Sequence, residues 1–175
     1  PGPFNLLVDL GTGTGRVLEF LVDRYEQALG IDINHAMLAY ARGKLAEAGI
    51  THAQVRYGDL YALSLGDGVA DAVVVHQVLH FLDDPSRALR EAARVLQPGG
   101  RVIVVDFAPH THEHLREQHA HRRLGVSEAD LAGWSEKAGF EQSFSRTFDA
   151  PNGEKGISVM VWAADVAKSA RRSAA

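Results

Sequence analysis

The stretch Leu6-Leu7-Val8-Asp9-Leu10-Gly11-Thr12-Gly13-Thr14-Gly15 decides the fold. It begins as a short apolar run that contains one acid, and three glycines then alternate with threonines before an apolar helical pattern starts at Val17. A strand, a glycine turn and a helix in this order bring backbone close to a nucleotide-like ligand. Glycine allows positive φ and carries no Cβ that would keep a ligand away.

The glycine spacing differs from the dinucleotide-binding pattern Gly-x-Gly-x-x-Gly, which places a pyrophosphate at a helix N-terminus. Here the pattern is Gly-x-Gly-x-Gly, and Asp9 lies two residues before the first glycine. An acid near the ligand suits a cation better than a phosphate. The stretch resembles motif I of the class I S-adenosylmethionine (SAM)-dependent methyltransferases, whose sulfonium ligand carries an ammonium group and no phosphate. The resemblance implies that Asp9, Gly11, Thr12, Gly13 and Gly15 bind the cofactor SAM.

The composition is that of a water-soluble domain. The chain has 175 residues, of which 46% are hydrophobic and 23% charged, and this length suits one domain. A net charge of −4 excludes a global basic field, so we expect no nucleic acid bound by this domain. No apolar run approaches the roughly 20 residues that span a bilayer, so we expect no membrane partner. The absence of cysteine excludes disulfides and thiolate metal sites and is typical of a cytoplasmic protein.

Predicted strands alternate with predicted helices along the chain. Strands are expected at residues 6–10, 28–33, 53–57, 69–75 and 101–107, and helices at 14–25, 34–48, 86–96 and 128–138. Asn34 and Ser127 are the expected caps, and Gly49 and Gly139 the expected stops. Two late strands, 140–149 and 157–163, would form a hairpin across Pro151-Asn152-Gly153. The pattern predicts a three-layer, doubly wound Rossmann-like α/β sheet, mostly parallel with a C-terminal antiparallel hairpin, over residues 1–165, followed by a frayed tail at 166–175.

Two further acids follow predicted strands. Asp32 lies 23 residues after Asp9, close to the offset at which an acid meets ribose hydroxyls in nucleotide-binding folds, and Ile33 follows it. A carboxylate can accept two hydrogen bonds from a cis-diol. The alternative is a solvated aspartate at a strand end. By the family resemblance, Asp59 and Leu60 would lie at the adenine, although Asp59 could instead cap the next turn.

A second stretch is the most specific signal in the chain. The segment LHFLDDP…ALREAARVLQPGG, followed by an apolar strand, resembles the small-molecule methyltransferases of quinone biosynthesis. Together with the glycine turn, the resemblance covers residues 6–107. It implies a SAM-dependent methyltransferase with a small-molecule acceptor.

The residues after the fourth predicted strand are candidates for cofactor contact and catalysis. His76 and Gln77 follow that strand, and ligands bind at the carboxyl ends of such strands. His76 and His80 are the nearest candidate bases, although His80 could serve in packing instead. No Asp/Asn-Pro-Pro-aromatic segment stands here, which argues against methylation of nucleic acid amino groups. The missing cysteines argue against arsenic methylation by thiolates.

Residues 110–123 hold five of the nine histidines. We expect this histidine-rich segment to form a lid or wall on the acceptor side of the cleft and to bind no structural metal. The alternative is a metal site made from His112, Glu113 and His114 or from the pair His119 and His121.

The segment VDFAPHTHEHLREQHAHRRLGVSEADLAGWSEKAGF carries a third resemblance, to methyltransferase domains that bacteria fuse behind an ArsR-type winged-helix repressor domain. It implies a winged-helix domain before Pro1. It also opens a second function, in which the domain senses SAM or S-adenosylhomocysteine with little or no turnover. A homodimer is one assembly left open.

Overall fold

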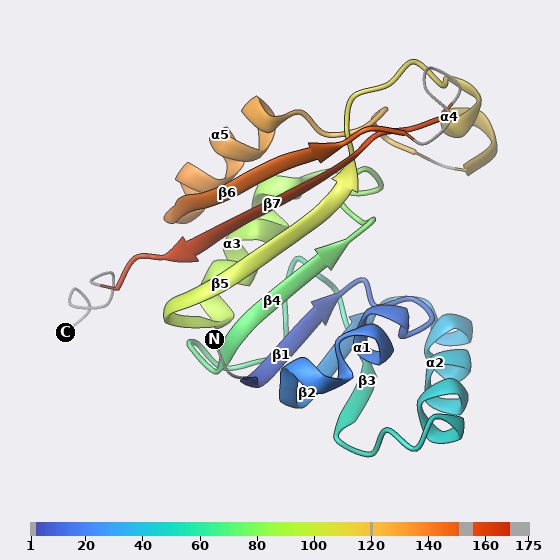
Figure 1. The fold of residues 1–175 in the computed structure, drawn as a ribbon, viewed down its shortest axis with the longest axis vertical. Coiled ribbons are helices and arrows are strands. Elements are labelled where there is room, and N and C mark those ends of the chain that lie inside the picture. Colours follow the sequence, from blue (N-terminus) through green and yellow to red (C-terminus); the bar gives the residue numbers. More distant parts are fainter. Residues whose placement is uncertain (1–2, 120, 151–155, 169–175) are drawn as a thin grey trace.

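The computed structural model describes residues 3–119, 121–150 and 156–168, and within these ranges one seven-stranded sheet has the order β3-β2-β1-β4-β5-β7-β6 (Figure 1). Its strands are β1 (Phe4–Leu10), β2 (Tyr25–Asp32), β3 (Ala53–Tyr57), β4 (Ala70–His76), β5 (Leu96–Phe107), β6 (Phe140–Phe148) and β7 (Val159–Val166). The helices are α1 (Arg16–Phe20), α2 (His35–Glu47), α3 (Pro85–Val95), α4 (His114–His119) and α5 (Glu128–Ala138), with a 3₁₀ turn, η1, at Val22–Arg24.

The strand directions confirm the predicted fold class. The strands β1 to β5 pair in parallel, whereas β7 pairs antiparallel with both β5 and β6. Strand order reverses between β1 and β4, which places the crevice for a ligand at the carboxyl ends of these strands. The predicted hairpin turn at residues 151–153 lies outside the described residues.

Both faces of the central strands are buried. Leu7 packs in a cluster with residues of α1 and α2, and Val8 packs in a second cluster with residues of α3 and α5. Adjacent residues of a strand point to opposite faces, so β1 contributes to both clusters. Figure 1 shows α3 and α5 behind the sheet and α1 and α2 beside the β1–β3 end. Among the described residues, no helix is long and apolar enough to cross a membrane.

The caps predicted for two helices are confirmed. The side chain of Asn34 accepts hydrogen bonds from the backbone amides of Ala36 and Met37 at the start of α2. Ser127 accepts from the amide of Asp130 at the start of α5, and Gly139 ends that helix with a φ of 82°.

Several predicted boundaries are wrong. The helix expected at 14–25 is only α1, because Tyr25 opens β2 beside Phe4 and its hydroxyl donates to the carbonyl of Leu18 at 2.7 Å. Strand β5 starts at Leu96 rather than at 101, since Leu96 already pairs with Ala70. The tail predicted at 166–175 starts too early, because Val166 is a buried residue of β7 that pairs with Phe140; residues 169–175 lie outside the described part of the chain.

Candidate cofactor site

The glycine turn joins β1 to α1 in a conformation that favours glycine. Gly11, Gly13 and Gly15 have φ values of 76°, 52° and 75°. The amides of Gly11 and Thr12 both donate to the carbonyl of Ile31, at 2.8 and 3.1 Å, which holds the turn against the end of β2. A Cβ on Gly11 would lie 2.4 Å from Val78 Cγ2, whereas one on Gly13 would meet no atom closer than 4.0 Å. Gly11 is therefore required because Val78 packs against it, whereas the absence of a side chain at Gly13 leaves open space.

That open space belongs to a cavity of about 550 Å³ at the carboxyl ends of the strands, a volume suited to a small ligand. It brings together seven predicted cofactor residues, namely Gly11, Gly13, Asp32, Ile33, Asp59, Leu60 and Gln77. It also includes residues that the sequence reasoning missed, namely Asn34, Met37, Tyr61, Val78, Phe81 and Leu82. The spacing of the last three is that of one face of a helical turn, a signal that was available in the sequence.

Four predicted cofactor residues lie off the cavity wall: Asp9, Thr12, Gly15 and His76. Thr12 is buried and occupies the space where a Cβ of Gly30 would lie. Gly15 faces α2, since its Cβ would lie 3.2 Å from that of Ala41. Thr12 and Gly15 therefore pack the glycine turn against β2 and α2 and do not line the cavity, and their contact with the cofactor stays a prediction.

Asp9 is a fully buried carboxyl group beneath the glycine turn, and neither of its oxygens has a hydrogen-bond partner among the described residues. Burial raises the pKa of Asp9 from its ordinary 3.8 to about 7. The nearby Thr12 hydroxyl opposes this rise in pKa without forming a hydrogen bond of normal geometry, and the charge of Asp32 adds to it. A buried acid without a partner is costly in the ionised form, and a cation bound nearby would offset that cost.

Asp32 lies on the cavity wall at the end of β2. Its Oδ2 accepts a hydrogen bond from the amide of Gly13, and its Oδ1 accepts one from the amide of Asn34, both at 2.8 Å. A carboxylate has about four acceptor positions, so both oxygens can still accept from a ligand diol. Asp32 thus holds the glycine turn and remains able to bind a ribose.

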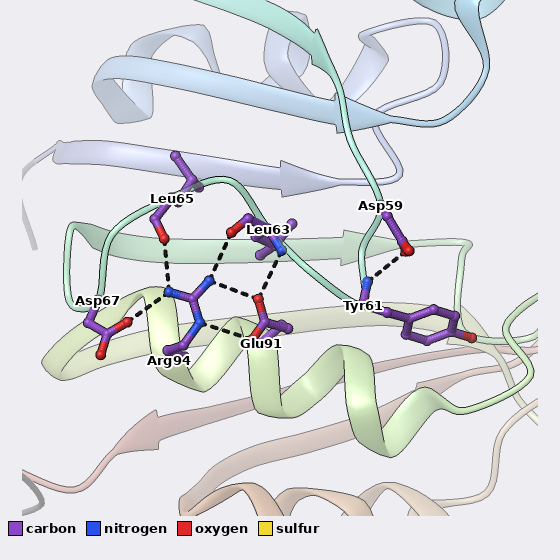
Figure 2. Close-up of polar contacts among 7 residues, drawn as sticks. All are labelled: Asp59, Tyr61, Leu63, Leu65, Asp67, Glu91 and Arg94. Carbon is purple, nitrogen blue, oxygen red and sulfur yellow. Dashed lines mark hydrogen bonds and ion pairs between the residues drawn. The ribbon is translucent and has the colours of Figure 1, made fainter.

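The third acid, Asp59, also lines the cavity, and its Oδ1 accepts from the amide of Tyr61 at 2.8 Å. It therefore caps the following turn, as the alternative interpretation expected, while it also lies on the cavity wall. Figure 2 shows how the loop beyond Tyr61 is held by α3: Arg94 donates to the carbonyls of Leu63 and Leu65, and Glu91 accepts from the amide of Leu63.

His76 and Gln77 diverge at the end of β4. Gln77 has a φ of 58° and lines the cavity. Its backbone N–H donates to the carbonyl of Val105 at 2.7 Å. His76 instead lines an apolar cleft of about 330 Å³ on the α1 side of the sheet, with Phe20, Leu21 and Val105. Partial burial lowers the pKa of His76, and the charge of Asp106 opposes this. Its expected cofactor contact is thus not supported by the cavity lining.

The structure buries His80, the second candidate base, away from the cavity lining. Its side chain is 2% exposed, and its Nδ1 lies 2.6 Å from Oδ1 of the fully buried Asp106. The imidazole packs between Phe81, Phe107 and His121. A buried ring in this position serves the packing role that was the alternative for this residue.

The histidine-rich segment lies at the carboxyl end of β5 and carries α4 (Figure 1). None of its described residues lines the cofactor cavity. The rings of His110, His112 and His114 follow one another at 5.3 and 5.7 Å between centroids. Among the described residues, no group of three or more histidines and acids is placed to hold a metal ion.

The charges of the cavity indicate the class of ligand. Its described lining residues include Asp32 and Asp59 but no lysine, arginine or histidine, and Asp9 lies beneath its glycine turn. A phosphate would meet two carboxylates there with no basic side chain to offset them. A sulfonium and an ammonium group with a ribose diol fit this set of residues.

Comparison with known families agrees with this geometry. The family model described as "Methyltransferase domain" matches residues 8–104, more than half of the chain. The chain belongs to the class I SAM-dependent methyltransferase family. The demethylmenaquinone methyltransferase of Thermus thermophilus is 39% identical over 107 residues, which cover 59% of this chain and 47% of that protein. The chain thus spans about half the length of this curated relative.

Solved structures share the fold. Geranyl diphosphate methyltransferase in complex with SAM has a TM-score of 0.80 at 16% identity, over 94% of this chain and 79% of that one. The [4+2]-cyclase SpnF has a TM-score of 0.82 at 21% identity, over 95% and 76% of the two chains. The cofactor of the methyltransferase domain is SAM. The glycine turn, Asp32 and Asp59 are the residues that would hold it.

We predict that Gly13→Val abolishes SAM binding and leaves the domain folded. A branched side chain at this position would fill the cavity, and calorimetry together with circular dichroism measures both effects. Gly49→Val is the matched control, since Gly49 has a φ of 69° and open space around its Cβ but lies outside the cavity. Both variants carry the strain of a β-branched residue at positive φ. Retained SAM affinity in a folded Gly13→Val would show that the turn does not face the cofactor.

We predict that Asp32→Ala weakens SAM binding at least tenfold, because a lost hydrogen-bonded contact to a charged group costs about 1.5–3 kcal/mol. Asp71→Ala is the control: Asp71 accepts from the amide of Leu6 at 2.8 Å but lies at the amino end of β4. Calorimetric titration with SAM compares the two variants. An unchanged affinity in folded Asp32→Ala would remove this acid from the site.

We predict that stability falls as the pH rises from about 4 to 7 because of Asp9. Between its unfolded pKa of 3.8 and its folded pKa of about 7, the folded state binds the proton and the unfolded state does not. The Asp9→Asn variant should not show this fall. Its free energy of unfolding in urea, relative to that of the unmodified domain, should therefore grow with pH up to about 8. SAM affinity should rise over the same range in the unmodified domain only, because ionised Asp9 favours a cation. Parallel pH profiles for the two proteins would contradict the assignment.

Proposed function

We propose that the domain transfers a methyl group from SAM to a small, largely apolar acceptor. The observation that carries this proposal is the divergence of His76 and Gln77, neighbours at the end of β4 that line two different hollows. Gln77 belongs to the cofactor cavity, and His76 belongs to the apolar cleft. A cofactor on one side and an acceptor on the other would meet at this strand end.

The cleft supports an apolar acceptor with one polar group. Its walls are mainly aliphatic and aromatic, from Phe20, Leu21, Val74 and Ile103, and its polar side chains are Arg16 and His76. The Thermus relative is named for a quinone precursor, which is consistent with an apolar ring as acceptor. The chain lacks cysteine, and we retain a cytoplasmic setting for this reaction.

When bound, SAM supplies an electrophilic methyl group on a sulfonium. The chain's own residues then provide position and a base. His76 is neutral at pH 7 because burial lowers its pKa, so its imidazole can take the proton that an acceptor hydroxyl loses as its oxygen gains the methyl group. The cleft walls would exclude water from the acceptor.

We predict that His76→Asn lowers kcat by about 10²–10⁴-fold and leaves SAM affinity unchanged, the range typical of a lost general base. The assay measures S-adenosylhomocysteine production with a panel of phenols, hydroquinones and carboxylates. In the unmodified domain the rate should fall as the pH drops below the pKa of His76, which burial places below its ordinary 6.5. His52→Asn is the control, since His52 lies before β3, away from the cleft. An equal loss of rate in both variants would exclude His76 as the base.

Sensing of the cofactor is the second candidate function. SpnF is named as a cyclase and shares this fold, so the fold does not by itself imply methyl transfer. In this alternative the domain would bind SAM or S-adenosylhomocysteine without turnover and control a winged-helix domain of a longer protein. Binding of both ligands with no product from any acceptor, together with a winged helix encoded before Pro1, would favour sensing.

A further inference from the structure

One wall of the cofactor cavity is a turn without a helix of its own. Residues 77–82, here called the wall turn, provide Gln77, Val78, Phe81 and Leu82 to the lining. Within the turn, the amides of Phe81 and Leu82 donate to the carbonyls three residues earlier, at 3.0 and 3.2 Å. Two such bonds do not fix where the turn lies, so contacts with other parts of the chain must hold it in place.

Asp106 holds the wall turn from behind. Its Oδ2 accepts from the amide of Leu79 at 2.9 Å, and its Oδ1 lies 2.6 Å from His80 Nδ1. Its Oδ1 also accepts from the amide of Phe107 at 2.8 Å. The carboxylate is fully buried, and a buried charge is tolerated only when it is paired and hydrogen-bonded. The hydrogen bond to Oδ2 of Asp106 therefore exists only while the turn stays in place.

The histidine-rich segment is tied to the same turn. The amides of Arg122 and Arg123 both donate to the carbonyl of His80, at 2.9 and 3.3 Å. The guanidinium of Arg123 also donates to the carbonyls of Leu79 and Leu82, the latter at 2.8 Å. The ring of His121 packs on that of His80 with centroids 4.3 Å apart. Residues 121–123 thus contact and hydrogen-bond the wall turn on the side away from the cavity.

We propose that Asp106 and His80 are positioning residues for the cofactor and that Arg123 couples cofactor binding to the order of the histidine-rich segment. The ligand touches the front of the wall turn, through Phe81 and Leu82. Asp106 and Arg123 hold its back. A ligand that fixes the turn therefore also fixes the carbonyls on which residues 121–123 depend, and the coupling is reciprocal by linkage.

The proposal rests on the cofactor of the family and not on methyl transfer or on the identity of the acceptor. Its test uses S-adenosylhomocysteine alone as the probe. A failure of the proposed transfer reaction would leave the result of this test unchanged, so the two hypotheses can fail separately.

The first arm measures affinity. Asp106→Asn should weaken S-adenosylhomocysteine binding at least tenfold, because an amide cannot accept at both of its polar atoms from the turn. Asp71→Asn is the matched control, an aspartate that also bonds a backbone amide but lies at the amino end of β4. Calorimetry is done well below the melting temperature of each variant, so that lower stability alone does not change the affinity. Equal affinities in the unmodified domain and in folded Asp106→Asn would overturn the positioning role.

The second arm measures coupling and does not depend on Asp106→Asn folding. In the unmodified domain, S-adenosylhomocysteine should slow hydrogen exchange at the amides of Arg122 and Arg123 at least fivefold. Arg123→Ala should lose most of this protection while its affinity changes by less than about threefold. Arg123→Lys should restore part of the protection, because an ammonium group can still donate to a carbonyl of the turn.

Two further variants separate the tether from other contacts of this region. The guanidinium of Arg123 lies 5.5 Å from the centre of the Trp134 ring, so Trp134→Leu removes that contact, leaves an apolar side chain against the core and should keep the protection. Arg116→Ala removes a donor to the carbonyl of Arg122 that does not reach the turn, and it should also keep the protection. Undiminished protection in Arg123→Ala, or none in the unmodified domain, would overturn the coupling.

Discussion

The carboxylate of Asp32 joins the two backbone segments between which the cofactor cavity lies. One oxygen accepts from Gly13 and the other from Asn34, so a single side chain ties the glycine turn to the start of α2. The glycine turn has little side-chain surface with which to hold itself, and its three glycines all lie at positive φ. Asp32 and the carbonyl of Ile31 give it a fixed place, and the open space at Gly13 follows from that.

The acids of the site have different environments and therefore different uses. Asp32 is satisfied by two amides and stays available to a diol, whereas Asp9 is buried without a partner and has a pKa raised to about 7. An unpaired buried acid is a cost to folding that a cationic ligand can offset. This links the stability of the domain to its ligand, because ionised Asp9 is disfavoured without a cation and favoured with one.

Two neighbouring residues at the end of β4 line the two sites of the proposed reaction, the apolar cleft and the cofactor cavity. His76 faces the apolar cleft and Gln77 the cavity, and the wall turn that follows is held from behind by Asp106. SpnF, named as a cyclase, has the same fold, so the fold does not by itself determine the function. Asp106 and Arg123 do not line the cavity, yet they hold the wall on which a ligand would rest.

The sequence by itself determined the alternation of strands and helices, the glycine turn, the caps at Asn34 and Ser127 and the position of Asp32 on the cavity wall. These depend on residues close together in the chain, where periodicity and capping are strong signals. Only the tertiary structure decided that α1 is short, that His76 leaves the cavity and that His80 is buried. His80 meets Asp106 from 26 residues away, and Tyr25 opens β2 because it pairs beside Phe4. Strand pairing and register set which face a side chain takes, and contacts between residues far apart in the chain set that register.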